Sequence, residues 1–222
     1  MPGFFYEERM EPNEIKEIIK QEKLIPILRT QTPGIVMNVA KAVADSGCRV
    51  LEYTMTIDGI IPEIGKVKDK YPDLIIGLGT VLNEKDANEA IQNGVDFIVS
   101  PILNYDIIDI VKKNGKMLIL SGFTPTEIYN AYKAGSDIIK LFPASEVAPT
   151  FISKLKGPFP FIEIFPTGGL NLISAMQFLS YGAIAVGMGN TVFKNELIER
   201  RNFEEITSIL KNAYRRIKNL EF

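Results

Sequence analysis

The chain has 222 residues, of which 46% are hydrophobic, so it can bury the core of one large domain or two small ones. Its formal charge of −2 gives no electrostatic basis for binding nucleic acid or an anionic membrane surface. No apolar stretch approaches the roughly 20 residues needed to cross a bilayer, and the first residues lack the basic and apolar regions of a signal peptide. We therefore expect a cytoplasmic protein, consistent with its single cysteine, Cys48.

Histidine is absent from the sequence, and this absence narrows the possible chemistry. It removes the commonest general base, the Ser/His and Cys/His nucleophile pairs, and the usual zinc ligand sets. Acid–base chemistry near pH 7 must then use Glu, Asp, Lys, Tyr or water. We predict lysine chemistry with no metal and no cofactor, while an oxygen-liganded Mg²⁺ site stays open as an alternative.

The chain begins with residues 1–22, which we interpret as an N-terminal extension containing a polar helix from Pro12 to Glu22. Residues 23–222 then repeat one pattern: short, β-branched apolar runs alternate with helical patterns at intervals of roughly 20 to 25 residues. The last segment, from Phe203 to Ile217, is amphipathic and is expected to complete an outer ring of helices. The eight apolar runs are Leu24–Leu28, Arg49–Tyr53, Leu74–Leu78, Phe97–Val99, Met117–Leu120, Ile138–Phe142, Phe161–Phe165 and Ala183–Val186.

Eight strand–helix units predict a parallel sheet, and closure of that sheet gives a single-domain (β/α)8 TIM barrel. A doubly wound open sheet is the structural alternative. Two prolines, Pro33 and Pro125, suit the first turn of a helix, with Thr32 and Thr124 as N-caps. Glycines expected in the left-handed conformation near helix ends are Gly47, Gly94, Gly115, Gly135 and Gly182.

Polar residues collect at the carboxyl ends of the predicted strands, which is where barrels of this class place their active sites. The amino ends offer mostly Lys23, Asp73 and Asp96, which we expect to be ordinary solvated positions. The polar carboxyl ends are Arg29, Glu52 with Thr54, Thr80, Ser100-Pro101, Ser121-Gly122, Lys140, Thr167-Gly168-Gly169 and Gly187 to Asn190.

Lys140 and Glu52 are charged residues inside apolar strands, where an unpaired charge is costly. Burial favours the neutral form of an amine, and a neutral amine attacks carbonyl carbons. We predict that Lys140 is a Schiff-base nucleophile and that Glu52 carries protons, directly or through water. The alternative is a buried ion pair without a catalytic role.

Two glycine turns follow the seventh and eighth strands, Thr167-Gly168-Gly169 and Gly187 to Asn190. Barrels often bind phosphate at this place through backbone N–H groups, although any tight turn also needs glycine. Arg29 at the end of the first strand could hold a carboxylate or a phosphate in a bidentate contact, or simply be a solvated strand end.

The sequence resembles the family of 2-keto-3-deoxy-6-phosphogluconate (KDPG) aldolases and 4-hydroxy-2-oxoglutarate (KHG) aldolases, from about Leu24 to Lys194. The resemblance rests on seven strings in the family's order. They are Ile25-Pro26-Ile27-Leu28-Arg29, Gly77-Leu78-Gly79-Thr80-Val81-Leu82, Ser100-Pro101, Thr124-Pro125-Thr126-Glu127, Lys140-Leu141-Phe142-Pro143, Lys156-Gly157-Pro158-Phe159-Pro160 and Pro166-Thr167-Gly168-Gly169.

This resemblance implies a homotrimeric, metal-independent class I aldolase that acts on a small keto-acid. It assigns the Schiff base to Lys140 and the proton transfers to Glu52. It implies that Arg29 and Thr80 hold the pyruvate portion and that Pro101 and Phe142 line the site. Phosphate would bind at Thr167, Gly168 and Gly169 and at the strand-eight turn with Gly189 and Asn190.

The implied reaction is cleavage of KDPG to pyruvate and glyceraldehyde 3-phosphate. Alternative substrates are KHG and 2-keto-3-deoxy-6-phosphogalactonate, and a further alternative is a non-catalytic barrel that binds a phosphorylated ligand. The sequence departs from the family at three places. Thr56 stands where many members carry an arginine, Asn190 where many carry a serine, and Leu120-Ser121 where strand five usually ends in Pro-Gly.

Overall fold

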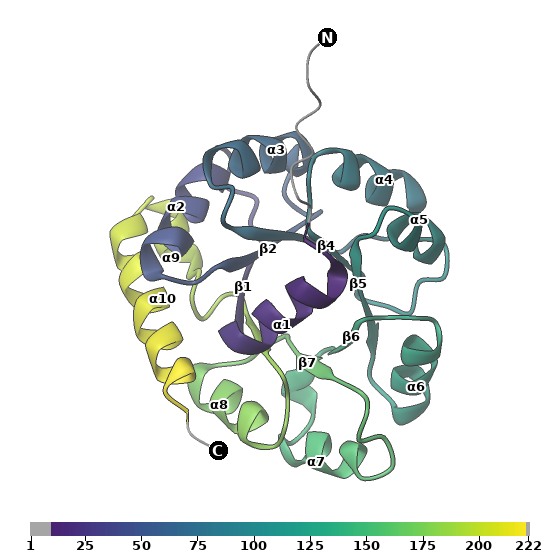
Figure 1. The fold of residues 1–222 in the computed structure, drawn as a ribbon. Helices are drawn as coiled ribbons and strands as arrows, with labels where there is room; N and C mark the ends of the chain where they lie inside the picture. The colour runs from purple at the N-terminus through teal and green to yellow at the C-terminus, as the bar shows by residue number, and fades with distance from the viewer. Residues whose placement is uncertain (1–9, 221–222) are drawn as a thin grey trace.

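The computed structural model describes residues 10–220, which form one ring of eight parallel strands surrounded by helices (Figure 1). The sheet order is β7-β6-β5-β4-β3-β2-β1-β8, so strands that are consecutive in sequence are neighbours in space. A parallel bridge between Thr167 and Gly187 brings β7 and β8 together at the two ends of this order. The prediction of a (β/α)8 barrel is confirmed, and the open doubly wound sheet is wrong.

The strands lie close to the predicted runs but differ at their ends. They are β1 Leu24–Leu28, β2 Val50–Thr54, β3 Ile75–Gly79, β4 Phe97–Val99, β5 Met117–Gly122, β6 Ile138–Leu141, β7 Ile164–Pro166 and β8 Val186–Met188. β7 begins later than predicted because Phe161 lies on the surface against Tyr132, with the ring centroids 5.0 Å apart. β8 also begins later, because residues 183–185 are irregular, with a bend at Ile184, before the chain enters the sheet at Val186.

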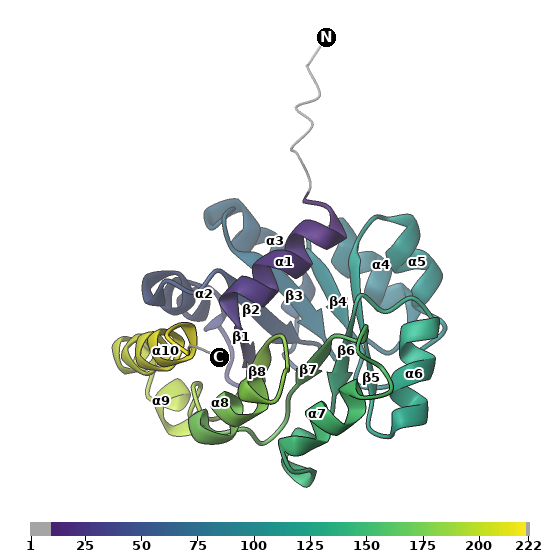
Figure 2. The same ribbon diagram turned by 60° about the horizontal axis from the view of Figure 1, so that its bottom comes forward.

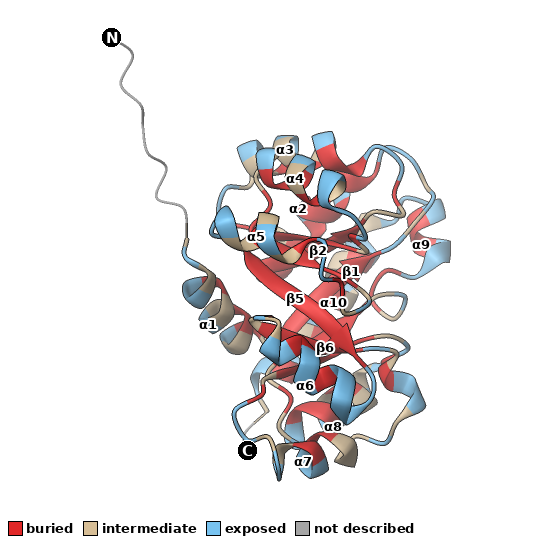
Figure 3. Ribbon diagram, turned by 90° about the vertical axis from the view of Figure 1, so that its right-hand side faces the viewer, coloured by how far each residue is buried: buried red, intermediate tan, exposed pale blue. Residues whose placement is uncertain are grey.

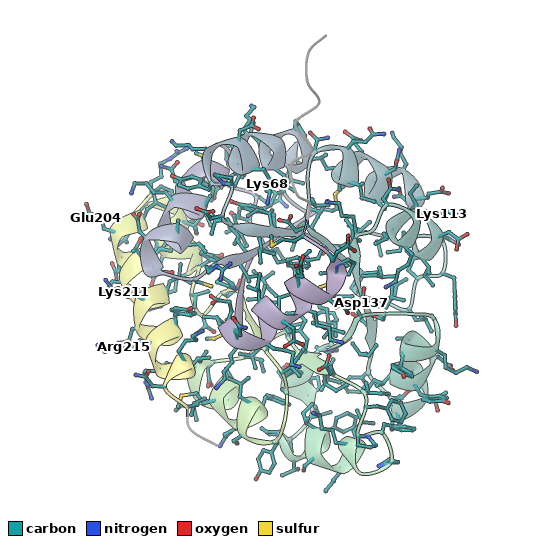
Figure 4. The ribbon with its side chains drawn as sticks, viewed as in Figure 1. Lys68, Lys113, Asp137, Glu204, Lys211 and Arg215 are labelled. Carbon is teal, nitrogen blue, oxygen red and sulfur yellow. The ribbon has the colours of Figure 1, made fainter. Side chains whose placement is uncertain are left out.

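Helices cover the outside of the ring and bury one face each (Figure 3). Figure 4 places Glu204, Lys211 and Arg215 on the outer side of α10, where their charges remain solvated. The helices are α1 Pro12–Glu22, α2 Val36–Ser46, α3 Ile60–Lys70, α4 Glu84–Gln92, α5 Ile108–Lys113, α6 Pro125–Lys133, the 3₁₀ helix η1 Ala144–Glu146, α7 Thr150–Lys156, α8 Leu172–Ser180, α9 Asn195–Glu199 and α10 Phe203–Lys218. No helix among them could span a lipid bilayer.

One of the two predicted proline starts is confirmed. Pro125 opens α6 behind Thr124, whose hydroxyl accepts from the Glu127 backbone N–H while the Glu127 carboxylate accepts from the Thr124 N–H. The start at Pro33 is wrong: α2 begins at Val36, where its buried face begins, and residues 29–34 form a loop. The five predicted left-handed glycines all have positive φ.

The barrel interior is apolar up to the carboxyl ends of the strands. Alternate strand residues point inward, and two side chains of α1, Ile15 and Ile19, pack among them. Helix α1 crosses the amino end of the ring (Figures 1 and 2). The helix that looked polar in the sequence therefore closes the bottom of the barrel. Residues 1–9 of the predicted extension lie outside the described residues.

The prediction that Asp96 is an ordinary solvated residue is wrong. Asp96 is only 9% exposed, and its Oδ2 accepts from the Ile76 backbone N–H and from Lys68 Nζ, both at 2.7 Å. The carboxylate therefore satisfies a backbone donor at the amino end of β3. This end of the barrel carries structural contacts, and the opposite end is free to hold a site.

Candidate active site

A cavity of about 270 Å³ opens at the carboxyl ends of the barrel strands. Its floor is set by inward-facing side chains of β1, β2 and β6, and its rim by the turns after β7 and β8. The lining residues are Ile27, Arg29, Glu52, Lys140, Phe142, Thr167, Gly168, Gly169, Leu170, Gly189, Asn190 and Thr191. The cavity thus collects the predicted site residues with the exceptions of Thr80 and Pro101.

Lys140 and Glu52 meet in this cavity from different strands. Lys140 Nζ lies 3.8 Å from Glu52 Oε1, and the two side chains are 7% and 1% exposed. The Nζ also lies 5.4 Å from the centroid of the Phe142 ring, close enough for a cation–π contact. The amine is therefore shielded from bulk water, and it faces a carboxylate and an aromatic ring.

Glu52 is buried without hydrogen bonds. Neither of its carboxylate oxygens has a hydrogen-bond partner among the described residues, because the 3.8 Å contact to Lys140 is too long for one. Burial raises the pKa of Glu52 above its usual value, while the charges of Lys140 and Arg29 act in the opposite direction. A carboxyl group in this state can accept and return a proton.

Gly79 makes the space that the Glu52 side chain occupies. β2 pairs in register with β3, and Thr54 lies opposite Gly79. A Cβ at Gly79 would collide with Glu52 Oε1, so the glycine is required for this carboxylate to lie inside the barrel. This close packing gives a physical reason for the glycines in the family-like string from Gly77 to Leu82.

Arg29 and Thr80 form a second polar pair beside the first. The Arg29 Nη2 donates to Thr80 Oγ1 over 3.2 Å, linking the ends of β1 and β3. Thr80 has φ of 64°, a left-handed conformation that is unfavourable for a β-branched residue. Backbone strain held at this position places the hydroxyl against the arginine, whose guanidinium presents donors at one side of the cavity.

The turns after β7 and β8 bring backbone groups to the rim. Gly168 and Gly169 have φ of 96° and 73°, in the region that glycine adopts without strain. A Cβ on Gly168 would approach the Phe142 ring to 2.9 Å, and one on Gly169 would approach Ser145 Cβ to 2.7 Å. Both glycines are therefore required by conformation and by packing. Asn190 is exposed at the rim of the cavity.

Pro101 and Thr80 do not line the cavity. Pro101 follows β4 and is half-buried, and Thr80 reaches the site through Arg29. The sequence analysis missed three lining residues, Ile27, Leu170 and Thr191. Strand alternation already placed Ile27 on the same face as Arg29, and Leu170 and Thr191 each follow a predicted glycine turn directly.

Two of the positions that depart from the family, Ser121 and Thr56, form hydrogen bonds with segments distant in sequence. Ser121 Oγ donates to the Ser100 carbonyl over 2.7 Å, and Ser121 pairs in register with Lys140 on the neighbouring strand. The Thr56 carbonyl accepts from Gln31 Nε2 over 2.8 Å. Within residues 10–220, no group of three or more His, Cys, Asp or Glu side chains is placed to hold a metal ion.

Comparison with known proteins agrees with this fold and identifies the family. The sequence profile of the KDPG and KHG aldolases matches residues 15–209. A 2-dehydro-3-deoxy-phosphogluconate aldolase of Pseudoalteromonas atlantica is 29% identical over 199 residues, which cover 89% of this chain and 93% of that protein. A 2-dehydro-3-deoxy-6-phosphogalactonate aldolase of Escherichia coli is 29% identical over 194 residues, which cover 86% and 94%.

The structural comparison gives the same result. The crystal structure of the 2-keto-3-deoxy-6-phosphogluconate aldolase of Zymomonas mobilis ZM4 with 3-phosphoglycerate matches this chain with a TM-score of 0.82 at 25% identity. The match covers 91% of this chain and 96% of that chain.

The fold and the cavity define a class, that of (β/α)8-barrel enzymes with polar residues at the carboxyl ends of the strands. Within this class the chain belongs to the KDPG and KHG aldolase family. It is an aldolase, a carbon–carbon lyase, of a family that works through a Schiff-base intermediate.

Proposed function

We propose that the cavity is the active site, that Lys140 forms the Schiff base, and that the substrate is KDPG. The observation that carries this proposal is the pairing of Lys140 with Glu52, 3.8 Å apart and buried, inside the cavity. Groups with burial and a specific charge partner cluster at functional sites. In an aldolase this pair supplies the two chemical parts that cleavage needs, a nucleophile for the ketone and a proton carrier.

The reaction starts when the neutral amine of Lys140 attacks C2 of the keto-acid. A carbinolamine forms, its hydroxyl takes a proton delivered through water, and it leaves as water to give a protonated imine. Glu52 takes the proton of the C4 hydroxyl, directly or through water, and the electrons of the C3–C4 bond flow toward the imine nitrogen. The aldehyde leaves, and an enamine of pyruvate remains on Lys140. Glu52 returns a proton to C3, and hydrolysis of the imine releases pyruvate and the amine.

Arg29 binds the carboxylate of the keto-acid in this proposal, and Thr80 helps by holding Arg29 in place. The guanidinium carries a fixed positive charge, and its 3.2 Å contact with the Thr80 hydroxyl holds it at the side of the cavity. No arginine is present at position 56, so Arg29 is the guanidinium available for the carboxylate among the cavity residues. Phe142 would limit the space around the bound pyruvate unit, whereas Pro101 lies outside the cavity lining.

The distal phosphate lies at the two glycine turns in this proposal. Gly168, Gly169 and Gly189 present backbone at the rim, Thr167 lies at the base of the first turn, and the Asn190 side chain can donate a hydrogen bond. The Zymomonas mobilis relative has a structure with 3-phosphoglycerate, a phosphorylated three-carbon acid. 3-Phosphoglycerate has the same three-carbon length as glyceraldehyde 3-phosphate, the cleavage product that carries the phosphate.

The first experiment is trapping with borohydride in the presence of pyruvate. We expect reduction of the imine to leave a stable adduct that peptide mapping finds on Lys140. Lys154, a lysine in α7, is the matched control and should carry none. An adduct mapped elsewhere, or none at all, contradicts the assignment of Lys140.

Cleavage of 2-keto-3-deoxy-6-phosphogalactonate is a second candidate function. It is favoured by the Escherichia coli relative of that name, which shares 29% identity with this chain, the same as the phosphogluconate aldolase. These two substrates differ in configuration at C4, where the bond breaks. A side-by-side assay of both phosphates and of KHG decides between them, and KDPG is expected to have the highest kcat/KM.

For the assembly we infer a homotrimer, in line with the family resemblance, and for the compartment a reducing cytoplasm. The compartment is supported by Cys48, a single, buried, free thiol. Neither cofactor nor metal enters the proposed reaction, so added chelator is expected to leave turnover unaffected.

A further inference from the structure

The site lies across the weakest seam of the barrel. β2 and β3 share five registered residue pairs, whereas β7 and the β8 segment are joined by the bridge between Thr167 and Gly187, just past the end of β7, and by the Ile184 N–H, which donates to the Ile164 carbonyl over 3.0 Å. The two glycine turns follow directly on either side of this seam. Any ligand that contacts both turns therefore depends on what holds them at a fixed separation.

The turn after β7 is held from the β6 side. The backbone N–H groups of Ala144 and Ser145 donate to the carbonyls of Thr167 and Gly168 over 2.9 and 3.1 Å. The turn after β8 is held within itself, since the N–H groups of Val192 and Phe193 both donate to the Gly189 carbonyl over 2.9 Å. These contacts fix the shape of each turn but not the distance between the two.

Thr191 connects the two turns. Its hydroxyl donates to the Leu170 carbonyl over 2.6 Å, and Leu170 directly follows Gly169 and is 3% exposed. A second cavity, of about 290 Å³, lies on the other side of Thr191 against α8 and α10. Because Thr191 lines both cavities, other side chains do not pack closely against it on the side of the second cavity. The hydrogen bond to Leu170 holds it in position instead.

We propose that Thr191 is a positioning residue that sets the separation of the two turns and thereby the affinity for the substrate phosphate. This inference rests on the proposed function, which places the phosphate at these turns. Thr191 acts through the backbone at Leu170 and Asn190. Loss of its hydroxyl leaves the buried Leu170 carbonyl without this partner and frees the turn after β8 to move toward the second cavity.

The test compares Thr191→Val, which keeps the shape and loses the donor, with Thr191→Ser, which keeps the donor. Each is assayed on KDPG and on its non-phosphorylated counterpart, 2-keto-3-deoxygluconate. Thr191→Val is expected to raise the KM for KDPG roughly five- to tenfold, the loss of about one hydrogen bond, with kcat within twofold. The preference for the phosphorylated substrate falls by the same factor, and Thr191→Ser restores it. Inhibition by inorganic phosphate weakens in parallel.

Thr191→Ala removes the same hydroxyl and serves if the valine variant folds poorly. Ser208→Ala, in α10 on the far wall of the second cavity, is the matched control and should behave as wild type. Equal losses on both substrates, or no loss in Thr191→Val, overturn the role of Thr191. Failure of the proposed phosphate site has a different signature: the wild-type protein itself then shows neither a preference for the phosphorylated substrate nor inhibition by phosphate.

Discussion

Glu52 is a carboxylate that the fold buries at a cost, since both of its oxygens lack hydrogen-bond partners among residues 10–220. Such a group is retained where its proton chemistry is used. We expect Glu52→Gln to form the imine with pyruvate, because the amide keeps the volume and Lys140 remains. Turnover should fall by about 10² to 10⁴, the usual contribution of a positioned acid–base group. Borohydride trapping measures the first property and steady-state cleavage the second.

An unchanged turnover in Glu52→Gln would show that water or another group moves the protons. Glu163→Gln is a suitable control, because Glu163 pairs with Lys16 of α1 at 2.7 Å, away from the cavity. That variant is expected to retain wild-type cleavage.

The pH dependence of cleavage should report the charge of Arg29. Burial raises the pKa of Glu52, and the positive charge of Arg29 opposes this rise. Glu52 acts as a base in its ionised form, so activity is lost as the pH falls through its pKa. Arg29→Gln removes a charge that lowers this pKa, and the acid limb of kcat/KM should move to higher pH.

Arg29→Lys separates charge from shape. It keeps the positive charge, so the acid limb should stay near its wild-type position. The loss of the guanidinium fork should still raise the KM for the keto-acid in both variants, by roughly 10-fold or more for a charge-assisted contact. An acid limb that moves to lower pH in Arg29→Gln contradicts the placement of Arg29 beside Glu52.

Many individual site residues could be predicted from the sequence, because a charged residue inside an apolar strand is unusual. Lys140 and Glu52 stand out for this reason, and strand alternation directs both to the interior. Thr191 was not found, because a threonine in a turn is ordinary and its hydrogen bond to Leu170 spans 21 positions. The strained φ of Thr80 was equally hidden, since nothing in the local sequence calls for a left-handed threonine.

At the scale of the elements, helix α1 shows what periodicity does and does not reveal. Its bounds follow from Pro12 at the first turn and the left-handed C-cap at Lys23. Its role in closing the barrel does not follow in the same way, because only two of its buried residues, Ile15 and Ile19, are apolar, and they make a narrow stripe on a polar helix. That stripe packs into the interior core cluster that also contains Phe97 and Ile138, which are far from α1 in the sequence.

Removal of this stripe should destabilise the whole barrel. Ile19 is fully buried at the amino end, so Ile19→Ala is expected to lower the free energy of unfolding by about 2 to 5 kcal/mol. Ile18 is only partly buried at the edge of the same cluster, and Ile18→Ala should cost less than about 1 kcal/mol. Urea unfolding measures both. Equal effects would indicate that α1 does not close the barrel as described.

On the scale of the whole molecule, the two ends of the barrel have separate tasks. At the amino end, ion pairs such as Lys68 with Asp96 and the helix α1 close the structure. At the carboxyl end, the inward-facing side chains of the strands change from apolar to polar, and the cavity forms there. Alternation of strands and helices predicted this division, because parallel strands bring all carboxyl ends to one face. The second cavity beneath α10 was not predictable, since it depends on how two helices meet.

The proposed trimer is a property of the whole molecule that the mass in solution can test. One chain has a mass of 24.8 kDa, and we expect light scattering coupled to size exclusion to give three times this value. Because the proposed active site is complete within one chain, the amount of borohydride adduct should correspond to one per chain in the assembled protein. A monomer mass with full activity would contradict the trimer and leave the site intact. One adduct per three chains would instead show that assembly allows a single cavity to react, and would contradict the independence of the three sites.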